Sequence, residues 1–403
     1  MNTKKQFWTF RYALINIIYY MSFCTIHAFA AVYLLDKGFT NTEIGILLAV
    51  ANTFSALLQP YVAGLIDKPG KFTNRNVIMG SSALILLGSL ILMFVNDVHV
   101  IIFIVFALIY MIQFVYQPVI TALVFEYQKA GANIFYGLAR GLGSAGFAVS
   151  SAFVGNAVES FGVQFLLYVN VATMAALVLV TYFFRKPTGQ IEETSVTSQT
   201  LSNGEEEAKA HNNLFEFAKL YPVFMILLVA TVLLFFGHNM LNDYLIQIIK
   251  NVGGSEKDLG YATFLAALLE LPTMATISLI IKKVSPKKLL IMAGTFFTIK
   301  VLVMLVATNM AMVYASQACQ LLAYAAFIPS AAYYVNEQLQ ELDQVKGQAF
   351  ISSGITLGGV FSGLICGPVL DKAGVKTMLI IGLVVSAIGT ITIFKAMLSK
   401  NKN

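Results

Sequence analysis

The sequence predicts an all-α integral membrane protein with twelve transmembrane helices in two six-helix halves and with both termini in the cytoplasm. Three observations lead to this fold class. The chain of 403 residues is 58% hydrophobic and only 11% charged, whereas soluble domains are about half apolar and roughly a quarter charged. Apolar stretches long enough to cross a bilayer recur from end to end. One polar segment interrupts them near the middle of the chain.

Twelve apolar runs are the predicted spans. The six runs of the first half are 8–35, 43–66, 76–95, 98–126, 135–158 and 163–184, and those of the second half are 218–247, 258–281, 288–307, 309–336, 346–370 and 376–398. Residues 186–213 between them are polar and lack aromatic side chains, which predicts a flexible cytoplasmic linker. The predicted domains are therefore residues 1–185 and 214–403.

The two halves resemble each other in their loops. "GFTNTEIG" at 38–45 aligns with "GGSEKDLG" at 253–260, and "GNAVESFGV" at 155–163 aligns with "GPVLDKAGV" at 367–375. Each pair falls in loops between equivalent predicted helices. Parallel six-helix repeats of this kind are typical of secondary transporters.

The basic residues indicate the orientation. Positive charge collects in cytoplasmic loops of membrane proteins. With both termini inside, most of the 26 Lys and Arg residues fall in cytoplasmic segments. Two lie within spans, Arg140 and Lys300, and the outer loops hold Lys37, Lys250, Lys257, Lys372 and Lys376. The net charge of +6 thus reflects membrane orientation, and we expect no nucleic-acid partner.

Polar residues recur every three or four positions on several spans, which places them on one face of each helix. A ring of such helices predicts a wet central cavity, although amides and hydroxyls also join helices to each other in lipid. The stripes are Asn16, Tyr20, Cys24 and His27; Asn52, Ser55 and Gln59; Gln113, Gln117 and Thr121; Asn239, Asp243 and Gln247; and Gln317, Gln320 and Tyr324.

Charges inside the spans are the sharpest functional candidates, because an intramembrane charge is costly and needs a partner or a function. Lys300 and Glu270 fall far from either predicted surface. Arg140, in the glycine-rich helix "YGLARGLGSAGF", either contacts substrate or extends its side chain to the cytoplasm. Glu126 lies at a helix end, where it is a coupling candidate or an interfacial residue.

The loop "GLIDKPGKFTNR" at 64–75 resembles the signature loop of the major facilitator superfamily. The resemblance implies the major facilitator fold and a role in conformational gating for Gly64, Asp67, Lys68, Gly70 and Arg75. "FSALLQPYVAGLIDKPG" at 54–70 and "YGLARGLGSAGF" at 136–147 resemble the lactose permease branch, the oligosaccharide:proton symporters. That similarity implies that Arg140 is the sugar-binding arginine, Phe147 the aromatic platform and Lys300 a basic residue of the ninth helix.

The sequence departs from that branch at its best-known coupling groups. The sugar-binding acid falls at Thr121, and the eighth-helix acid falls near Ala267, one turn before Glu270. The tenth-helix lysine, histidine and glutamate fall at Gln317, Gln320 and Ala323. We therefore do not expect lactose itself or the same proton route.

The predicted function is proton-coupled symport of a small polar solute, a sugar or oligosaccharide, by alternating access. We expect a monomer in the inner (plasma) membrane, in contact with the bilayer, the solute and protons, without cofactor or metal. Glu270, Asp243, Lys300 and Glu126 are the proton-coupling candidates. The substrate-binding candidates are Arg140, Phe147, Asn16, Tyr20, His27, Gln117, Thr121, Asn239, Gln317, Gln320 and Tyr324.

Two alternatives remain open, and an enzyme is not expected. A multidrug or aromatic-compound transporter of the same fold is favoured by the 31 Phe and 18 Tyr residues, but the polar stripes argue against it. A transport-inactive membrane sensor would bind the solute without moving it. An intramembrane enzyme would need a nucleophile or metal constellation, and neither HExxH nor GxSxG occurs in the sequence.

Overall fold

The computed structural model describes residues 3–66, 72–95, 98–187 and 214–398, and every regular element within these ranges is helical. The all-α prediction is confirmed. Almost all of the predicted linker at 186–213 lies outside the described residues, as do Asp67, Lys68 and Gly70 of the predicted gating loop.

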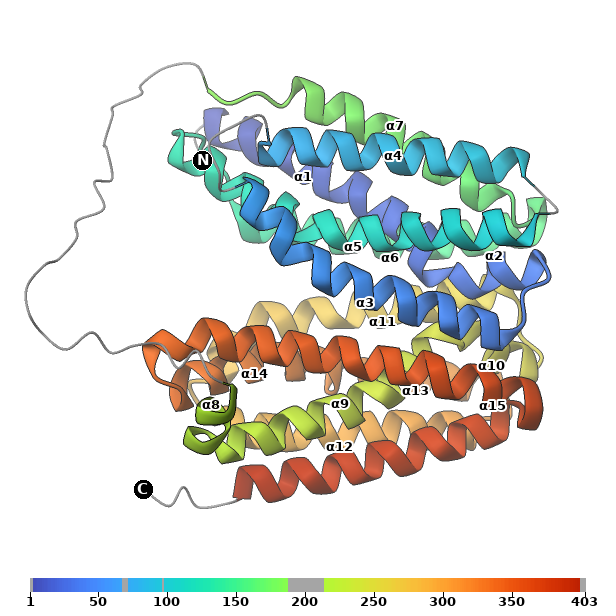
Figure 1. The fold of residues 1–403 in the computed structure, drawn as a ribbon, viewed down its shortest axis with the longest axis vertical. Coiled ribbons are helices and arrows are strands. Elements are labelled where there is room, and N and C mark those ends of the chain that lie inside the picture. Colours follow the sequence, from blue (N-terminus) through green and yellow to red (C-terminus); the bar gives the residue numbers. More distant parts are fainter. Residues whose placement is uncertain (1–2, 67–71, 96–97, 188–213, 399–403) are drawn as a thin grey trace, which may run out of the picture.

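The helices form two bundles that lie side by side (Figure 1). The first bundle contains α1 (Thr3–Phe23), a π-helical turn (Cys24–Ala28), α2 (Ala30–Asp36), α3 (Asn41–Ile66), α4 (Asn74–Phe94), α5 (His99–Lys129), α6 (Tyr136–Phe161) and α7 (Phe165–Phe183). The second contains α8 (Leu214–Leu220), α9 (Pro222–Asp243), α10 (Leu245–Asn251), α11 (Glu256–Ile280), α12 (Pro286–Leu305), α13 (Met310–Ala318), a 3₁₀ turn (Cys319–Leu321), α14 (Tyr324–Gln338) and α15 (Glu341–Leu398). Gly374, with φ of 76°, divides α15 into two helices.

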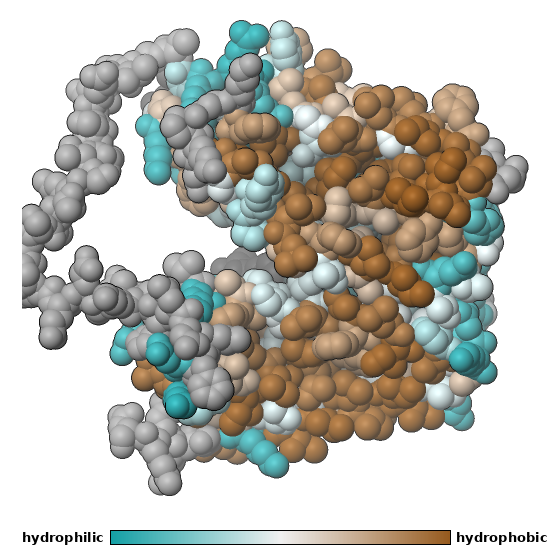
Figure 2. Space-filling model, viewed as in Figure 1, coloured by the Kyte–Doolittle hydropathy of each residue, from teal (hydrophilic) through white to brown (hydrophobic). Residues whose placement is uncertain are grey.

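The outer surface is suited to lipid. Figure 2 shows apolar side chains across the middle of the molecule and polar ones toward its two ends. Among the described residues, nine helices are long and apolar enough to cross a membrane, or ten if the bent pair Phe7–Ala28 and Ala30–Asp36 is one span. This count differs from the predicted twelve because α15 carries two predicted spans in one element, and because the acid-containing α11 is not among the nine. Twelve spans remain a prediction.

The bundles meet tightly at one end of the molecule, which we call the closed end. There α3 packs against α15 and α6 against α11. A Cβ atom on Gly45 would lie 2.1 Å from the Gly363 carbonyl oxygen, and one on Gly155 would lie 2.7 Å from the Glu256 carbonyl oxygen. Only glycine permits these backbones to approach so closely. At the opposite end, where α1 begins and α15 ends, the bundles separate (Figures 1 and 2).

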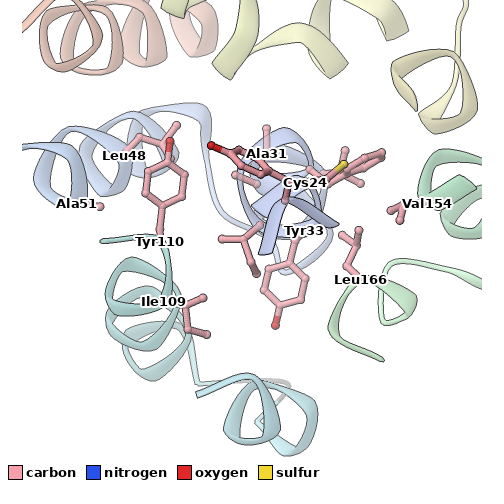
Figure 3. Close-up of a cluster of buried hydrophobic side chains, with 14 of the residues drawn as sticks. Cys24, Ala31, Tyr33, Leu48, Ala51, Ile109, Tyr110, Val154 and Leu166 are labelled. Carbon is pink, nitrogen blue, oxygen red and sulfur yellow. The ribbon is translucent and has the colours of Figure 1, made fainter. Parts of the chain in front are cut away.

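The interior of the first bundle joins its helices by aromatic packing and hydrogen bonds. Figure 3 shows Tyr110 of α5 pointing toward Leu48 and Ala51 of α3. Gln113 donates to Ser22 Oγ at 2.7 Å, and Ser22 in turn donates to Asn170 Oδ1. Gln113 therefore joins helices by hydrogen bonds, which was the alternative to a cavity-lining role for the polar stripes.

Candidate functional site

A cavity of about 430 Å³ lies between the two bundles, within the size range of small-molecule sites. Both bundles line it. The first contributes side chains from α1, the π-helical turn, α5 and α6, and the second from α9, α10, α11, the 3₁₀ turn, α14 and α15. The predicted central cavity is thus present between the bundles.

Breaks in three helices position polar residues of this cavity. His27 lies in the π-helical turn after α1, Gln320 in the 3₁₀ turn after α13, and Asp243 is the last residue of α9. A break of this kind interrupts the regular i to i−4 hydrogen bonds, and π-helical turns are frequent at functional sites. The backbone irregularities therefore coincide with the cavity wall.

Arg140 lies on α6 with its guanidinium carbon 4.4 Å from the centre of the Tyr20 ring. Its Nη1 donates to Ser144 Oγ at 2.9 Å, and Gln117 Nε2 donates to the Tyr20 hydroxyl at 2.9 Å. All four side chains line the cavity. The cation–π contact places the guanidinium against the Tyr20 ring, and its remaining N–H groups can bind paired acceptors on a solute.

Close contact between α6 and α1 places Arg140 over Tyr20. A Cβ atom on Gly143 would lie 2.8 Å from Tyr20 Cδ2. The glycine stripe that faces α1 consists of Gly143 and Gly146, whereas Gly137 and Gly141 have no other group within 4 Å of an added Cβ. The face of α6 that carries Gly143 and Gly146 therefore packs against α1, and the face that carries Gly137 and Gly141 does not.

Aromatic rings from both bundles form walls of the cavity. Phe147 lies 6.4 Å from Phe23 between ring centres, and both line the cavity from the first bundle. Across from them are Phe235 and Tyr324, and the Tyr324 ring stacks on His238 at 5.1 Å. Apolar faces with a few convergent polar groups are what small-molecule sites usually combine.

A hydrogen-bonded chain links the two charges in the second bundle. Lys300 Nζ donates to Gln320 Oε1 at 2.7 Å, and Gln320 Nε2 donates to Glu270 Oε1 at 2.7 Å. Glu270 and Gln320 line the cavity, whereas Lys300 is buried behind them with 1% of its surface exposed. The amide of Gln320 therefore satisfies both charged groups and holds them apart.

A second region of the cavity wall lies where α9 ends. We call it the deep region, and it consists of Asp243, His27 and the rings Phe23, Tyr110 and Phe114. His27 packs between Phe23, at 3.8 Å between ring centres, and Tyr110, at 3.9 Å. Within the described chain neither ring nitrogen of His27 has a hydrogen-bond partner. Asp243 is partly buried and also lines the cavity.

Several predicted site residues lie outside the cavity wall. Asn16 donates to the Tyr12 carbonyl oxygen at 3.1 Å, and Gln317 is buried with 1% exposure. The wall likewise does not include Thr121. Asn239, in contrast, does line the cavity, and its Nδ2 donates to the Ile355 carbonyl oxygen at 3.3 Å.

Glu126, for which the sequence left a coupling role and an interfacial role open, does not line the cavity. It lies 2.5 Å from Lys186 Nζ and accepts a hydrogen bond from Asn74 Nδ2 at 2.7 Å, away from the cavity. Of the described gating-loop residues, Gly64 is part of α3, and Arg75 donates to the carbonyl oxygens of Thr181 and Tyr182 on α7.

Sequence reasoning missed several aromatic residues of the wall, namely Phe23, Tyr110 and Phe114. A signal was present, since Phe23 lies three residues after Tyr20 and four before His27, on the same helical stripe. The stripes were defined by polar side chains, which left the aromatic positions out.

Across residues 3–66, 72–95, 98–187 and 214–398, no group of three or more His, Cys, Asp or Glu side chains could hold a metal ion.

The MFS_1 like family matches residues 9–381. The nucleoside transporter NupG shares the fold with a TM-score of 0.75 and 15% identity over 98% of both chains, and a point mutant of NupG with 0.79 and 14% over 97% of this chain and 100% of that one. A bacterial homologue of the human lysosomal transporter Spinster, in an inward-facing and unoccupied conformation, has a TM-score of 0.68 at 13% identity over 98% of both chains. No curated protein matches the sequence.

Proposed function

Because the chain belongs to the MFS_1 like family, we propose that it is a proton-coupled secondary transporter of a small polar solute, a sugar or oligosaccharide, that works by alternating access. Its family and the proteins that share its fold are transporters rather than enzymes. The substrate class and the coupling to protons are our proposal.

One observation carries this function. A single cavity between two bundles combines a fixed guanidinium at Arg140, aromatic faces such as Phe147, and a carboxylate at Glu270. Arg140 would bind adjacent hydroxyls, and Phe147 would stack on the apolar face of a sugar ring. Because both bundles supply the wall, a relative movement of the bundles changes the solute's access to either side.

The charge count supports the orientation that we propose. Lys and Arg residues gather at the end where α1 begins and α15 ends, which supports cytoplasmic termini. We therefore propose a twelve-span monomer in the inner membrane whose closed end faces outward. In this orientation the cavity would exchange solute with the cytoplasm.

Glu270 is the proposed proton carrier. It lines the cavity and is linked through Gln320 to the buried Lys300. A proton on Glu270 would remove its attraction to Lys300, so protonation and the packing of the second bundle depend on each other. Arg140, whose charge also acts on Glu270, would sense the same change from the first bundle.

A nucleoside is the second candidate solute. Aromatic rings line the cavity from both bundles, Phe147 and Tyr20 from one and Phe235 and Tyr324 from the other, which would suit a flat base as well as a sugar ring. NupG, a nucleoside transporter, has the same fold. At 15% identity the likeness concerns the fold, and the uptake assay below distinguishes a nucleoside from a sugar.

The test is uptake into proteoliposomes that contain the purified protein. Monosaccharides, disaccharides, nucleosides and lipophilic cations would be offered with and without an imposed proton gradient. We expect one sugar or nucleoside to accumulate above its outside concentration, and a protonophore to abolish that accumulation. Uptake of lipophilic cations alone would indicate a multidrug transporter. Binding without uptake or counterflow would indicate a sensor.

A further inference from the structure

Two carboxylates, Glu270 and Asp243, line the cavity, and their hydrogen-bond partners and neighbouring charges differ. Glu270 accepts a hydrogen bond from Gln320 and is near two cations, Lys300 and Arg140. Asp243 has neither kind of support. Among the described residues, no hydrogen bond or ion pair reaches the Asp243 carboxylate, and no cationic side chain offsets its charge.

An unsupported carboxylate in a partly buried position is unfavourable, because a charge removed from water needs a partner. Two lining residues close to Asp243 in the sequence or in the cavity wall, Leu245 and Leu259, are apolar and cannot pair with it. Two partners could complete the site: a proton, or a hydrogen-bond donor brought by the solute.

The aromatic side chains of the deep region favour the second partner. Phe23, His27, Tyr110 and Phe114 all line the cavity and contact one another, with 4.4 Å between the ring centres of His27 and Phe114 and 5.3 Å between those of Phe23 and Phe114. Tyr110 lies near enough to Asp243 for the carboxylate charge to act on it. A carboxylate beside a group of aromatic rings is the surrounding in which proteins bind amines, by an ion pair or hydrogen bond and by cation–π attraction.

We propose that Asp243 accepts an N–H from an amino group of the solute, so that the deep region selects amino-substituted rings over their hydroxyl or carbonyl counterparts. This inference rests on the proposed function and narrows its substrate class. Arg140 and Asp243 lie in different parts of one cavity, and a solute would present hydroxyls to the first and its amino group to the second. An aminosugar and the exocyclic amino group of a nucleobase share this chemistry.

The experiment compares matched ligands on the purified full-length protein by isothermal titration calorimetry. The pairs are glucosamine with glucose, cytidine with uridine, and adenosine with inosine. We expect the amino member of at least one pair to bind about tenfold tighter. An ammonium adds a charge that a hydroxyl lacks, and a carbonyl oxygen in place of an amino group would face the carboxylate without a donor. A preference for glucosamine alone identifies a cationic amine, and a preference for cytidine or adenosine identifies a nucleobase.

Variants then assign that preference. Asp243→Leu removes the acceptor and should reduce the ratio of the two dissociation constants to below about threefold. Asp243→Asn keeps a neutral oxygen and should retain an intermediate ratio. Asp36→Asn changes an acid at the end of α2 whose side chain is 47% exposed, and should leave the ratio unchanged. Because each ratio is measured within one variant, changes common to both ligands cancel, and melting curves confirm folding.

The outcomes separate the inference from the function on which it rests. If the wild-type protein binds both members of every pair equally, or if Asp243→Leu keeps the full preference, the amino-group site is overturned while sugar or nucleoside transport stands. If Asp243→Asn loses proton-driven accumulation but keeps the full preference, Asp243 is a proton site instead. If no compound binds at all, the proposed function fails, and the inference fails with it.

Discussion

The central residues are four ionisable side chains whose charges balance. Arg140 and Lys300 are the cations, and Asp243 and Glu270 are the anions. Glu126, the remaining charged coupling candidate of the sequence, pairs with Lys186 away from the cavity. Gln320 links Glu270 to Lys300 by hydrogen bonds. Arg140 and Asp243 line the cavity and can form further hydrogen bonds with a solute. In our proposal the linked pair serves proton coupling, and the other two groups bind the solute.

Gln320 is expected to stabilise the second bundle through both of its hydrogen bonds. Gln320→Leu would leave the buried Lys300 ammonium and the Glu270 carboxylate without this partner, at a cost of about 1–3 kcal/mol in the free energy of unfolding. Gln317→Leu is the matched control, because in the described structure the Gln317 Nε2 is buried and already has no partner. Melting temperatures in detergent should fall for the first variant and hold or rise for the second. If Gln320→Leu and Gln317→Leu have equal melting temperatures, the hydrogen bonds of Gln320 add no stability.

Arg140 is expected to act through its planar guanidinium and not through charge alone. Arg140→Lys should keep the fold yet weaken binding of the transported solute by about tenfold or more, because an ammonium cannot make the paired hydrogen bonds of the fork. Arg185→Lys is the control, since Arg185 contacts Tyr182 outside the cavity. Calorimetry gives the dissociation constant of the solute for both variants. A dissociation constant for Arg140→Lys within about threefold of the wild-type value would exclude a paired contact.

At the scale of elements, the sequence predicted the extent of the helices better than their breaks. The first predicted span, 8–35, is α1, a π-helical turn and α2, with a bend of 50°. The run at 309–336 is likewise divided by a 3₁₀ turn. Neither "CTIHA" nor "CQL" contains the proline or glycine that marks a break in a sequence. The apolar pattern continues through both, and packing against the other helices decides where the hydrogen-bond pattern changes.

Those breaks also limited the prediction of the site. Tyr20, Gln117, Arg140 and Glu270 were predicted and line the cavity, because they project from regular helices whose faces can be read from spacing. The pairing of Gln320 with both Lys300 and Glu270 could not be read, since it depends on how three separate elements pack. Asn16 and Gln317 share stripes with cavity residues but are buried outside the cavity wall, each with 1% of its surface exposed.

Asp371 joins the bundles at the closed end by capping a helix of the other bundle. Its Oδ1 accepts from the backbone N and Nδ2 of Asn41 at 3.1 and 2.7 Å, and its Oδ2 accepts from the backbone N and Oγ1 of Thr42 at 2.7 and 2.6 Å. Asn41 begins α3, and the first N–H groups of a helix need such acceptors. One carboxylate thus satisfies the start of α3 only while the bundles are in contact.

Asp371→Ala is therefore expected to open the closed end more often. Loss of a helix cap costs about 0.5–2 kcal/mol, and here that cost falls only on the conformation in which the bundles meet. Spin labels at Ser160 and Lys257, which are exposed on either side of the contact, report the separation by pulsed electron resonance. A longer-distance population should grow in Asp371→Ala and not in the control Asp36→Ala. An unchanged distance distribution would show that other contacts hold the closed end.

At the scale of the whole molecule, the repeated loops acquire a structural meaning. Each of the four repeated motifs supplies a glycine to the closed end: Gly45 faces Gly363, Gly155 faces Gly260, and an added Cβ on Gly367 would lie 2.4 Å from the Asn41 carbonyl oxygen. The sequence revealed the repeat, but a single chain shows nothing of which loop meets which. The contacts between equivalent loops at one end and the cavity beside them support our proposal of alternating access.

Coupling of solute to protons is the central claim, and Glu270→Gln tests it most directly. The new amide keeps an oxygen for the hydrogen bond from Gln320 but cannot exchange a proton. Counterflow and uphill accumulation of the transported solute would be measured in the same proteoliposome preparation, with a proton gradient imposed for the second. We predict that Glu270→Gln exchanges solute within about threefold of the wild-type rate and fails to accumulate it. Accumulation at the wild-type level would contradict the account and remove Glu270 from the mechanism.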